Sequence, residues 1–477
     1  MIHLTPSMTG VASPDPLKFA FSAKTSAHAS RGGIRPLSLD ESQWQQWWQQ
    51  ESDAEERALY LHIPFCRKRC SFCNFFENGA NPARISRYVD GLCALLAKAA
   101  ETPLVQSGLF SAVYVGGGTP TDMNADELAM LARMIQRFPL TADAEVTLEG
   151  RLNGFDDAKW QAALSGGFNR FSFGVQSFDT GVRQQAARID DRETLLTRLG
   201  ELTRDDAAVI VADLIFGLPG QDDVVWQQDI TDVMASGVHG VDLYQLIAMP
   251  GTNLERAGQK GKLGWAADGQ QRAGQKGKLG WAADGQQRAA MYAYGGQQLE
   301  QHGWERLSCS HWRRSPAEQS RYNQMAKRGA EILPFGAGAG GTIHGHGVMY
   351  GRDLAQWHEA HEKGVRAPGM VMGRNPNARM DGLLRGALDS GVLALARLPA
   401  SLRSHLMPLF DAWRQNGLAD LAGDQLVLTL AGRFWNVNMQ AGLFEFLQHN
   451  PADGSEPALQ HGKHLDGKHP RVRHSLV

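Results

Sequence analysis

The stretch "YLHIPFCRKRCSFCNFF", residues 60–76, carries the most informative pattern in this chain of 477 residues. Three of the five cysteines, Cys66, Cys70 and Cys73, fall within eight residues. An odd, low cysteine count with tight local spacing argues against the disulfide framework of a secreted protein. The three thiols are therefore expected to act together as ligands of one metal centre.

Two kinds of metal centre fit this spacing. A structural zinc site needs four ligands, and His62 would complete the set as H-x3-C-x3-C-x2-C. A 4Fe–4S cluster is normally held by four thiolates, so three would leave one iron open for a substrate or cofactor. The cluster is the favoured interpretation, since nearby aromatic side chains would shield it and help to set its potential: Phe65, Phe72, Phe75 and Phe76.

A rhythm of short apolar segments and longer helical spacers begins at the same stretch. Strands are predicted at 58–65, 111–118, 144–150, 168–176, 207–217 and 240–247, with a helix at 222–237. Their β-branched and aromatic content is typical of buried parallel strands, and the spacers are long enough for crossover helices. The alternation predicts an α/β parallel sheet or barrel, which segments 303–310 and 332–339 are expected to extend.

The remaining chain divides around this core. Residues 1–50 are predicted to form an extension draped over the main domain, and 51–368 the core with its sheet extension. Residues 369–447 are expected to form a small, mainly helical domain with a short hairpin, and 448–477 a disordered, histidine-rich tail. The segment "RAGQKGKLGWAADGQQ" occurs twice, at 256–271 and 272–287. Identical copies indicate a recent duplication or a sequence artefact, tolerated as loop before a helix at 288–301.

Charge and hydropathy exclude several classes of function. The chain has 48 basic and 50 acidic residues, so no electrostatic footprint for nucleic acid is present. No apolar run approaches the ~18 residues of a membrane-spanning helix. The first residues lack the apolar centre of a signal peptide. These features predict a cytoplasmic protein with no membrane insertion.

The CxxxCxxC motif at the end of a first barrel strand resembles the signature of the radical SAM superfamily. The resemblance implies a partial (β/α)6 barrel with an extended sheet. It also implies that the open iron of the cluster binds the amino and carboxylate groups of S-adenosylmethionine (SAM). One electron from the cluster then cleaves the sulfonium to methionine and a 5′-deoxyadenosyl radical.

Further motifs over about 59–446 resemble the coproporphyrinogen-oxidase-like branch of that superfamily. "YLHIPFC" is similar to its entry strand, which implies that Tyr60 packs on the cofactor. "GGGTPT" (116–121) is similar to its glycine motif, which implies that Gly117, Gly118 and Thr119 approach the methionine moiety of SAM.

Polar residues at the predicted strand ends extend the resemblance. It implies that Glu149, Gln176, Arg188 and Asp213 contact SAM, and that Phe72 contacts the adenine. The alternative for each is a capping or turn residue. Catalytic groups in barrels gather at the carboxyl ends of strands, and polar residues in such apolar strands are costly unless they have partners.

Less specific sequence motifs indicate which member of the branch this chain resembles. Oxygen-independent coproporphyrinogen oxidases carry another cysteine two positions after the third, where this chain has Phe75. "YQL" (244–246) and "GAGA" (336–339) are shared with haem-chaperone relatives. "EGR" (149–151), "FAFSAKTSAHASRGG" (19–33) and "SCSHWRR" (308–314) most resemble the haem-utilisation radical SAM enzymes.

This resemblance implies an anaerobic, class C-type radical SAM methyltransferase that methylates and opens the haem ring, releasing iron and a linear tetrapyrrole. It implies two SAM molecules per turnover and an electron donor such as a flavodoxin or flavin reductase. Two alternatives stay open: a haem-binding trafficking protein, which would not consume SAM, and a coproporphyrinogen-oxidase-like enzyme, which Phe75 disfavours.

The haem contacts are predicted among histidines and arginines of the later loops. His311, His344 and His346 are candidates for iron or propionate contacts, and Arg313 and Arg314 for propionates. The alternative is that these are loop histidines and a solvated basic turn.

Overall fold

The computed structural model describes residues 2–24, 34–73, 78–247, 252–259, 264–265, 281–362 and 369–451. Its centre is a nine-stranded sheet in the order β12-β13-β9-β8-β7-β6-β5-β2-β14, in which β13 runs antiparallel to both of its neighbours. The strands are β2 (Arg57–Ile63), β5 (Phe110–Gly117), β6 (Leu140–Gly150), β7 (Arg170–Gln176), β8 (Val209–Phe216), β9 (Gly240–Gln245), β12 (Glu305–Arg306), β13 (His311–Arg313) and β14 (Glu331–Phe335). All six predicted barrel strands are present, and both predicted extensions join the sheet. The predicted fold class is confirmed.

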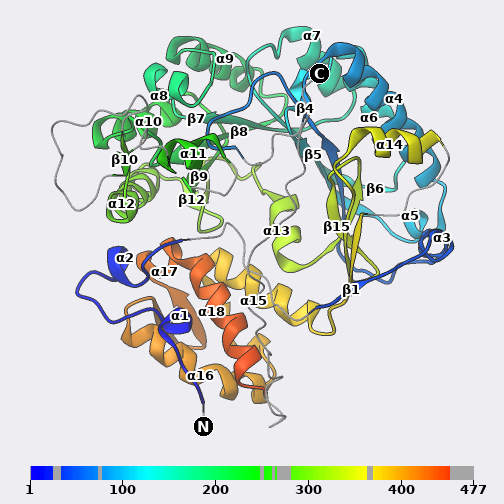
Figure 1. Cartoon of the computed structure of the whole chain (residues 1–477). Coiled ribbons are helices and arrows are strands. Elements are labelled where there is room, and N and C mark those ends of the chain that lie inside the picture. The colour runs from blue at the N-terminus through cyan, green and yellow to red at the C-terminus, as the bar shows by residue number, and fades with distance from the viewer. Residues whose placement is uncertain are drawn as a thin grey trace.

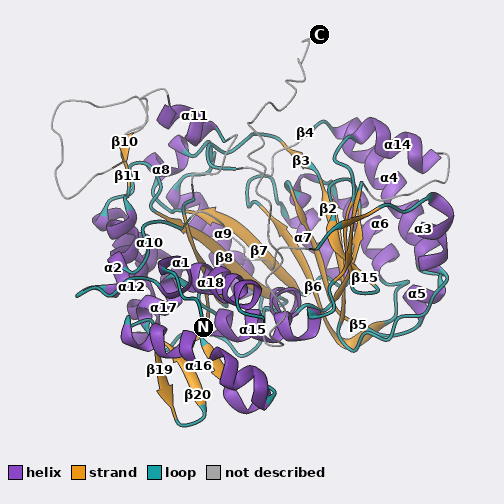
Figure 2. Ribbon diagram, turned by 60° about the horizontal axis from the view of Figure 1, so that its bottom comes forward, coloured by secondary structure: helices purple, strands orange, loops and turns teal. Residues whose placement is uncertain are grey.

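Helices cover the outer face of the curved sheet (Figures 1 and 2). They are α4 (Pro82–Ala99), α6 (Ala125–Ile135), α7 (Asp157–Ser165), α9 (Arg192–Arg204), α10 (Asp223–Ala235) and α12 (Gly285–Gln301). Each begins after an aspartate or asparagine whose side chain accepts a hydrogen bond from a backbone N–H of the first turn. The helices predicted at 222–237 and 288–301 correspond to α10 and α12.

The strands alternate between an apolar outer face and a polar inner face. On β2, Leu59 and Leu61 point into the main core, while Tyr60 between them points inward. Helix α13 (Arg321–Arg328) lies within the curve of the sheet (Figure 1). Its Tyr322 stacks on Tyr114 of β5 and on Tyr60, with ring centroids 4.8 and 6.2 Å apart. The inside of the barrel is therefore lined by polar and aromatic groups.

The C-terminal region is a small helical unit with a three-stranded sheet. It comprises α15 (Ala378–Ser390), α16 (Ala400–Gln415), α17 (Leu430–Phe434) and α18 (Asn436–His449), with the strand order β18 (Val392–Ala394), β20 (Gln425–Leu428), β19 (Ala419–Ala422). The N-terminal helices α1 (Pro6–Thr9) and α2 (Pro16–Phe19) pack on this unit. The Trp413 Nε1 donates to the Met8 carbonyl at 2.9 Å, and the Trp435 Nε1 to the Leu17 carbonyl at 3.0 Å.

A second sheet crosses the predicted domain boundaries. Its order is β1 (Pro36–Leu37), β17 (Met370–Arg374), β16 (His346–Met349), β15 (Gly340–Ile343), with α3 (Glu41–Trp48) and α14 (Leu354–Glu362) nearby. Strand β17 lies past residue 369, yet it pairs with β16 of the core and β1 of the extension. The division at 1–50, 51–368, 369–447 and 448–477 stays a prediction.

Several predicted features fall wholly or partly outside the described residues. The repeated segment is described at α11 (Asn253–Gln259), at β10 (Gly264–Trp265) paired with β11 (Trp281–Ala282), and at the start of α12. Residues 260–263, 266–280 and 452–477 are not described, nor are Phe75 and Phe76. Within the described chain, no helix is both long and apolar enough to cross a membrane.

Candidate active site

The three clustered cysteines lie on one loop at the carboxyl end of β2. Cys66 ends the short strand β3 (Phe65–Cys66), which pairs with β4 (Asn78–Gly79). Cys66 and Cys70 are buried, Cys73 is half-buried, and none of the three forms a disulfide. The Ser71 carbonyl accepts a hydrogen bond from the Leu254 N–H of α11 at 2.9 Å. The loop is thus tied to the segment that follows β9, across the mouth of the barrel.

Two side chains from neighbouring strands donate hydrogen bonds to the sulfurs. The Thr119 hydroxyl, just past β5, donates to the Cys66 Sγ at 3.3 Å. Arg151, just past β6, donates to the Cys70 Sγ at 3.4 Å and to the Lys68 carbonyl at 3.1 Å. Burial raises the pKa of the Cys66 thiol to about 11, and these two neighbours oppose the rise. Both donors favour the thiolate form that metal binding requires.

Arg151 was not among the predicted site residues. The sequence places it inside "EGR", two positions after Glu149 and beyond the last residue of a predicted strand. The only available signal was that position, because polar residues after parallel strands gather at the same edge of the sheet.

The glycine run at the end of β5 allows that strand to approach the cysteine loop. Gly117 has a φ of +111°, in the region that favours glycine, and a Cβ there would lie 2.7 Å from the His62 ring. A Cβ on Gly118 would collide with the backbone of Phe65, next to Cys66. The close approach brings Thr119 within reach of the Cys66 sulfur.

Two predicted SAM contacts are carboxyl groups on the inner face of the barrel. Burial raises the pKa of Glu149 on β6 to about 7, against hydrogen bonds from the Gly117 N–H and the Tyr114 hydroxyl. Burial, together with the negative charges of Asp242 and Glu149, raises the pKa of Asp213 on β8 to about 8. Near neutral pH both positions therefore hold carboxyl groups that are partly or mostly protonated.

The other two predicted SAM contacts, Gln176 and Arg188, lie where the backbone departs from regular structure. Gln176, at the end of β7, has a φ of +75° beside a bulge in the pairing with β8. Such a conformation in a residue other than glycine is a local strain that functional sites often retain. Arg188 follows α8 (Thr180–Gln185) and is buried. Burial lowers the pKa of Arg188, while the charges of the three cysteines oppose that effect.

The guanidinium of Arg188 is incompletely satisfied. Its Nε is buried and has no hydrogen-bond partner among the described residues. A buried donor left without an acceptor costs about 1–3 kcal/mol, so this group is a candidate for binding a ligand. An acceptor such as a carboxylate would satisfy it. The donors around the thiols and this free donor together fit the cluster and cofactor that the sequence predicts.

The two aromatic residues of the prediction have separate surroundings. The Tyr60 hydroxyl lies 2.9 Å from the His62 Nδ1 and its ring belongs to the tyrosine stack inside the barrel. Phe72, within the cysteine loop, packs against a small apolar cluster that includes Leu218 and Leu246, just past β8 and β9. Phe72 therefore lies at the barrel mouth, while Tyr60 lies deeper, on the inner face of the sheet.

The zinc alternative stays a prediction, with His62 as its fourth ligand. The Nδ1 of His62 faces Tyr60, and its ring packs on Gly117. Burial lowers the pKa of His62 to about 4, with help from the charge of Arg352. In the part of the chain that the structure describes, no three His, Cys, Asp or Glu side chains, the three cysteines included, are gathered closely enough to hold a single metal ion.

The predicted haem contacts all have protein partners. The His311 Nδ1 lies 2.9 Å from Asp242 and its Nε2 3.2 Å from Glu318. Burial lowers the pKa of His311, but the two carboxylates more than offset this and raise it to about 9. A charged imidazolium has no lone pair for iron, so the structure argues against His311 as an iron ligand.

The other four haem candidates lie on loops and strand edges. The His344 Nε2 is 2.9 Å from the Trp47 carbonyl, and the His346 Nδ1 is 3.1 Å from the Met372 carbonyl. Arg313 pairs with Glu305 at 2.6 Å, and the Arg314 Nη2 donates to the Gly237 carbonyl at 2.9 Å. Their predicted haem contacts stay predictions, and these partners favour the structural alternative.

Known proteins resemble this chain over the fold and the site. Residues 60–233 match the radical SAM superfamily. Anaerobilin synthase of Escherichia coli O157:H7 is 37% identical over 410 residues, which cover 85% of this chain and 87% of that protein. The haem chaperone HemW of a Synechocystis strain is 28% identical, with coverage of 72% and 80%.

Among solved structures, coproporphyrinogen III oxidase (HemN) from Escherichia coli superposes with a TM-score of 0.68 at 21% identity. The superposition covers 86% of this chain and 94% of that one, and it supports the fold alone. The match to anaerobilin synthase is long enough and identical enough to show the family as well as the fold. The chain belongs to the radical SAM superfamily, in its HemN/HemW branch.

Proposed function

We propose that this chain degrades haem without oxygen by radical SAM chemistry, methylating and opening the porphyrin ring with release of iron. The observation that carries the proposal is the 37% identity to anaerobilin synthase across 85% of the chain. That span extends well beyond residues 60–233, which match the superfamily at large. The likeness therefore includes regions outside the common catalytic core.

Cys66, Cys70 and Cys73 would hold a 4Fe–4S cluster, leaving one iron for SAM. When bound, the cluster would supply one electron that cleaves SAM to methionine and a 5′-deoxyadenosyl radical. The hydrogen bonds from Thr119 and Arg151 support this assignment, because donors to cluster sulfurs stabilise their negative charge.

The residues around the cysteine loop would bind and orient SAM. Arg188 offers a buried donor for its carboxylate, and the glycine run leaves room for the methionine moiety at Gly117, Gly118 and Thr119. We assign the remaining SAM contacts by their position on the inner face of the barrel and at its mouth: Tyr60, Phe72, Glu149, Gln176 and Asp213.

Haem, as substrate, would receive a methyl group from a second SAM, so two SAM molecules would be used per turnover. A flavodoxin or flavin reductase would supply electrons.

A haem-trafficking protein is the second candidate. The 28% identity to the haem chaperone HemW over 72% of the chain supports it. This candidate predicts haem binding with no productive use of SAM. A coproporphyrinogen-oxidase-like activity is less favoured, because the phenylalanine at position 75 replaces the further cysteine of those enzymes.

The test is an anaerobic assay. The protein is reconstituted with iron and sulfide, then given reductant, SAM and haem. Decay of the haem Soret band with accumulation of 5′-deoxyadenosine and a methylated linear tetrapyrrole is expected. A stable haem spectrum without use of SAM would instead establish the trafficking function.

A matched pair of cysteine variants tests the cluster site without an activity assay. Cys70→Ala should lose the iron and sulfide of the reconstituted protein, since two thiolates do not retain a 4Fe–4S cluster. Cys93→Ala is the control, because Cys93 is a buried free thiol on α4 outside the motif. Equal iron and sulfide in both variants would refute the site assignment.

A further inference from the structure

One tyrosine on the inner face of the barrel is unusually exposed. β9 lies between β8 and β13 in the interior of the sheet, yet 43% of Tyr244 is exposed. Asp242, two residues earlier and on the same face, is only 4% exposed, and its negative charge acts on the Tyr244 hydroxyl. Tyr244 therefore combines a partly accessible side chain inside the barrel with a neighbouring buried carboxylate.

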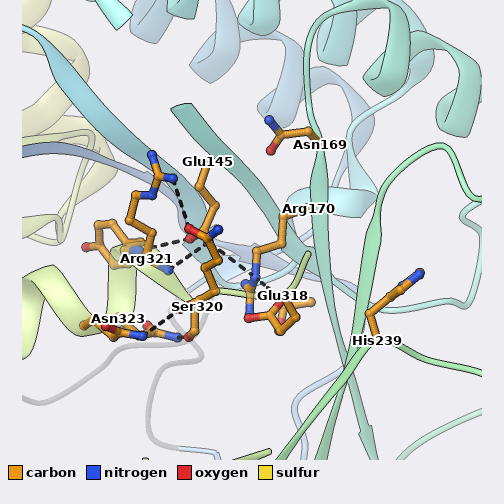
Figure 3. A network of polar contacts seen from close by, with 12 residues as sticks. Glu145, Asn169, Arg170, His239, Glu318, Ser320, Arg321 and Asn323 are labelled. Atoms are coloured by element: carbon orange, nitrogen blue, oxygen red, sulfur yellow. Dashed lines mark hydrogen bonds and ion pairs between the residues drawn. The ribbon is translucent and has the colours of Figure 1, made fainter. Parts of the chain in front are cut away.

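A chain of buried charges continues behind Asp242. Asp242 is the register partner of His311 on β13, whose Nδ1 lies 2.9 Å away. The His311 Nε2 is 3.2 Å from Glu318, and Glu318 accepts two hydrogen bonds from Arg170 at 2.9 and 3.1 Å. Arg170 and Glu318 point toward each other in Figure 3. The order is tyrosine, aspartate, histidine, glutamate, arginine.

In this row of residues, protons are held close to the exposed end, on Tyr244 and His311. Arg170 and His311 overcome the effect of burial and lower the pKa of Glu318 to about 2, so Glu318 stays ionised. Asp242 and Glu318 together raise the pKa of His311 to about 9 against the opposing effect of burial. Burial of the hydroxyl end of Tyr244 and the negative charge of Asp242 raise the pKa of this residue well above its usual value. At neutral pH both the phenol and the imidazole carry their protons.

Other charged groups face the same space. Asp213 and Glu149 lie on β8 and β6, and whichever of them is ionised raises the pKa of Tyr244 further. Lys327 of α13 faces Asp242 but pairs with Asp389 at 2.8 Å. Asp213 and Glu149 are assigned above to SAM. Tyr244 is thus the hydroxyl in this group that has a protonated histidine behind it.

Building on the function proposed above, we propose that Tyr244 protonates a nitrogen of the tetrapyrrole as iron leaves, and that His311 restores that proton through Asp242. An iron–nitrogen bond breaks with its electron pair staying on nitrogen, and the phenolic proton forms the new N–H bond. The iron leaves without a change of oxidation state, and the phenolate is reprotonated. The neutral imidazole then regains a proton from water, so no further oxidant or reductant is needed.

The chemistry of the substrate requires such a donor. The four nitrogens of a metalloporphyrin carry no protons, and two of them must gain one when the metal departs. A phenol is uncharged before transfer, so it can approach an apolar macrocycle at lower desolvation cost than a carboxylate or ammonium group. Asp242, His311, Glu318 and Arg170 would act as positioning residues that keep the proton available.

Tyr244→Phe keeps the ring and removes the proton, so it is the direct test. In the anaerobic assay, iron captured by a ferrous chelator and 5′-deoxyadenosine are followed together over the first turnover. The ratio of iron released to 5′-deoxyadenosine formed is expected to fall at least about tenfold. Tyr294→Phe, a partly buried tyrosine of α12, is the control and should keep the wild-type ratio.

The outcomes separate the two proposals. If wild-type protein degrades haem and Tyr244→Phe keeps the wild-type ratio, proton delivery by Tyr244 is refuted and the proposed function stands. If wild-type protein consumes no haem or SAM, the proposed function fails first.

A second measurement does not depend on turnover. Histidine-labelled protein without added haem is titrated by NMR, with His311→Gln used to assign the signal. His311 is expected to titrate near pH 9, and Asp242→Asn should lower its pKa clearly. A wild-type His311 that titrates near its ordinary 6.5 would overturn the relay even if Tyr244→Phe altered iron release.

Discussion

The two ends of the barrel differ in how completely their polar groups are satisfied. At the amino ends of the strands, Arg170 binds Glu318 through two hydrogen bonds, and Glu145 accepts the Arg321 N–H at 2.8 Å (Figure 3). At the carboxyl ends, the Arg188 Nε has no acceptor among the described residues. The His311 nitrogens beside Glu318 also make no hydrogen bond, but they lie at ion-pair distance from Asp242 and Glu318, whereas the Arg188 guanidinium has neither kind of partner among the described residues. A buried polar group that the protein leaves without a partner is a candidate for binding a ligand.

Backbone strain alone does not distinguish the two ends. Gln176 at the mouth has a φ of +75°, but Ser320 at the base has a φ of +50°. Ser320 precedes α13, and its hydroxyl accepts a hydrogen bond from the Asn323 side chain at 3.1 Å. The satisfied strain at Ser320 shapes the start of a helix. The comparison therefore depends on unfilled hydrogen bonds and unpaired charges, more than on unusual dihedral angles.

We expect the largest effect from a substitution in the network at the amino ends of the strands, the base of the barrel, where Arg170 binds Glu318. Arg170→Met would leave Glu318 buried beside His311 without its main partner, and should lower the free energy of unfolding by about 3–5 kcal/mol. Urea unfolding followed by circular dichroism measures this. Arg137→Met removes an arginine from an exposed pair with Glu101 and should cost less than about 1 kcal/mol. Similar losses in the two variants would contradict a structural role for the base network.

At the mouth, the corresponding arginine should matter for ligand binding rather than folding. Arg188→Leu removes a buried donor whose Nε has no acceptor among the described residues, so no hydrogen bond within that part of the chain is lost. We expect stability equal to or above that of the wild type, and SAM affinity lower by about 10- to 100-fold. Isothermal titration of reconstituted protein with SAM measures the affinity. Full affinity together with reduced stability would show that Arg188 belongs to the structural network.

The carboxyl groups of the two ends should respond oppositely to pH. The pKa of Glu149 rises from 4.5 to about 7 on folding, so the folded state binds more protons and stability falls as pH rises between these values. Glu149→Gln should then gain about 1–2 kcal/mol above pH 7 and nothing below pH 4. The pKa of Glu318 falls to about 2 on folding, so Glu318→Gln should lose stability above pH 4.5.

Denaturant unfolding at pH 4, 6 and 8 tests this pair of variants. A Glu149→Gln variant that is less stable than wild type at pH 8 would mean that the carboxylate is already compensated. In that case the mouth would resemble the base, and the distinction between the two ends would fail at this residue.

The barrel, and the edge at which the polar residues after its strands meet, were predictable from the sequence. Three local signals identify the barrel. They are the alternating or continuous apolar residues of the strands, the glycines at the strand ends, and the Asp or Asn before each helix. The cysteine spacing is local too, so the loop at the end of β2 could be placed before the structure was known. Residues that follow successive parallel strands must meet at one edge, which brings Glu149, Gln176 and Asp213 together.

The partners of individual side chains were not predictable in the same way. His311 meets Asp242 because β13 runs antiparallel to β9, and it meets Glu318 through the turn that precedes α13. No local pattern records these long-range pairings. For the same reason the sequence suggested His311 as an iron ligand, and gave no indication that Arg151 reaches the Cys70 sulfur. Spacing identifies chemistry within a loop, while register between distant strands decides which charges are already paired.

The smallest effect is expected at Arg313, the predicted propionate contact on β13. Its guanidinium already pairs with Glu305 at 2.6 Å on the exposed edge of the sheet, and its Nη1 donates to the Glu318 carbonyl at 3.2 Å. Arg313→Ala should therefore cost about 0–1 kcal/mol of stability, as exposed ion pairs do. Haem affinity, measured by absorbance titration, should stay within about twofold of wild type, because loss of a charged hydrogen bond to a propionate would cost about tenfold or more. A tenfold loss in Arg313→Ala but not in Arg314→Ala would establish the propionate contact. It would also show that an arginine paired in the protein alone can exchange its partner for the substrate, so that a filled hydrogen bond at the edge of the barrel does not by itself mark a residue as structural.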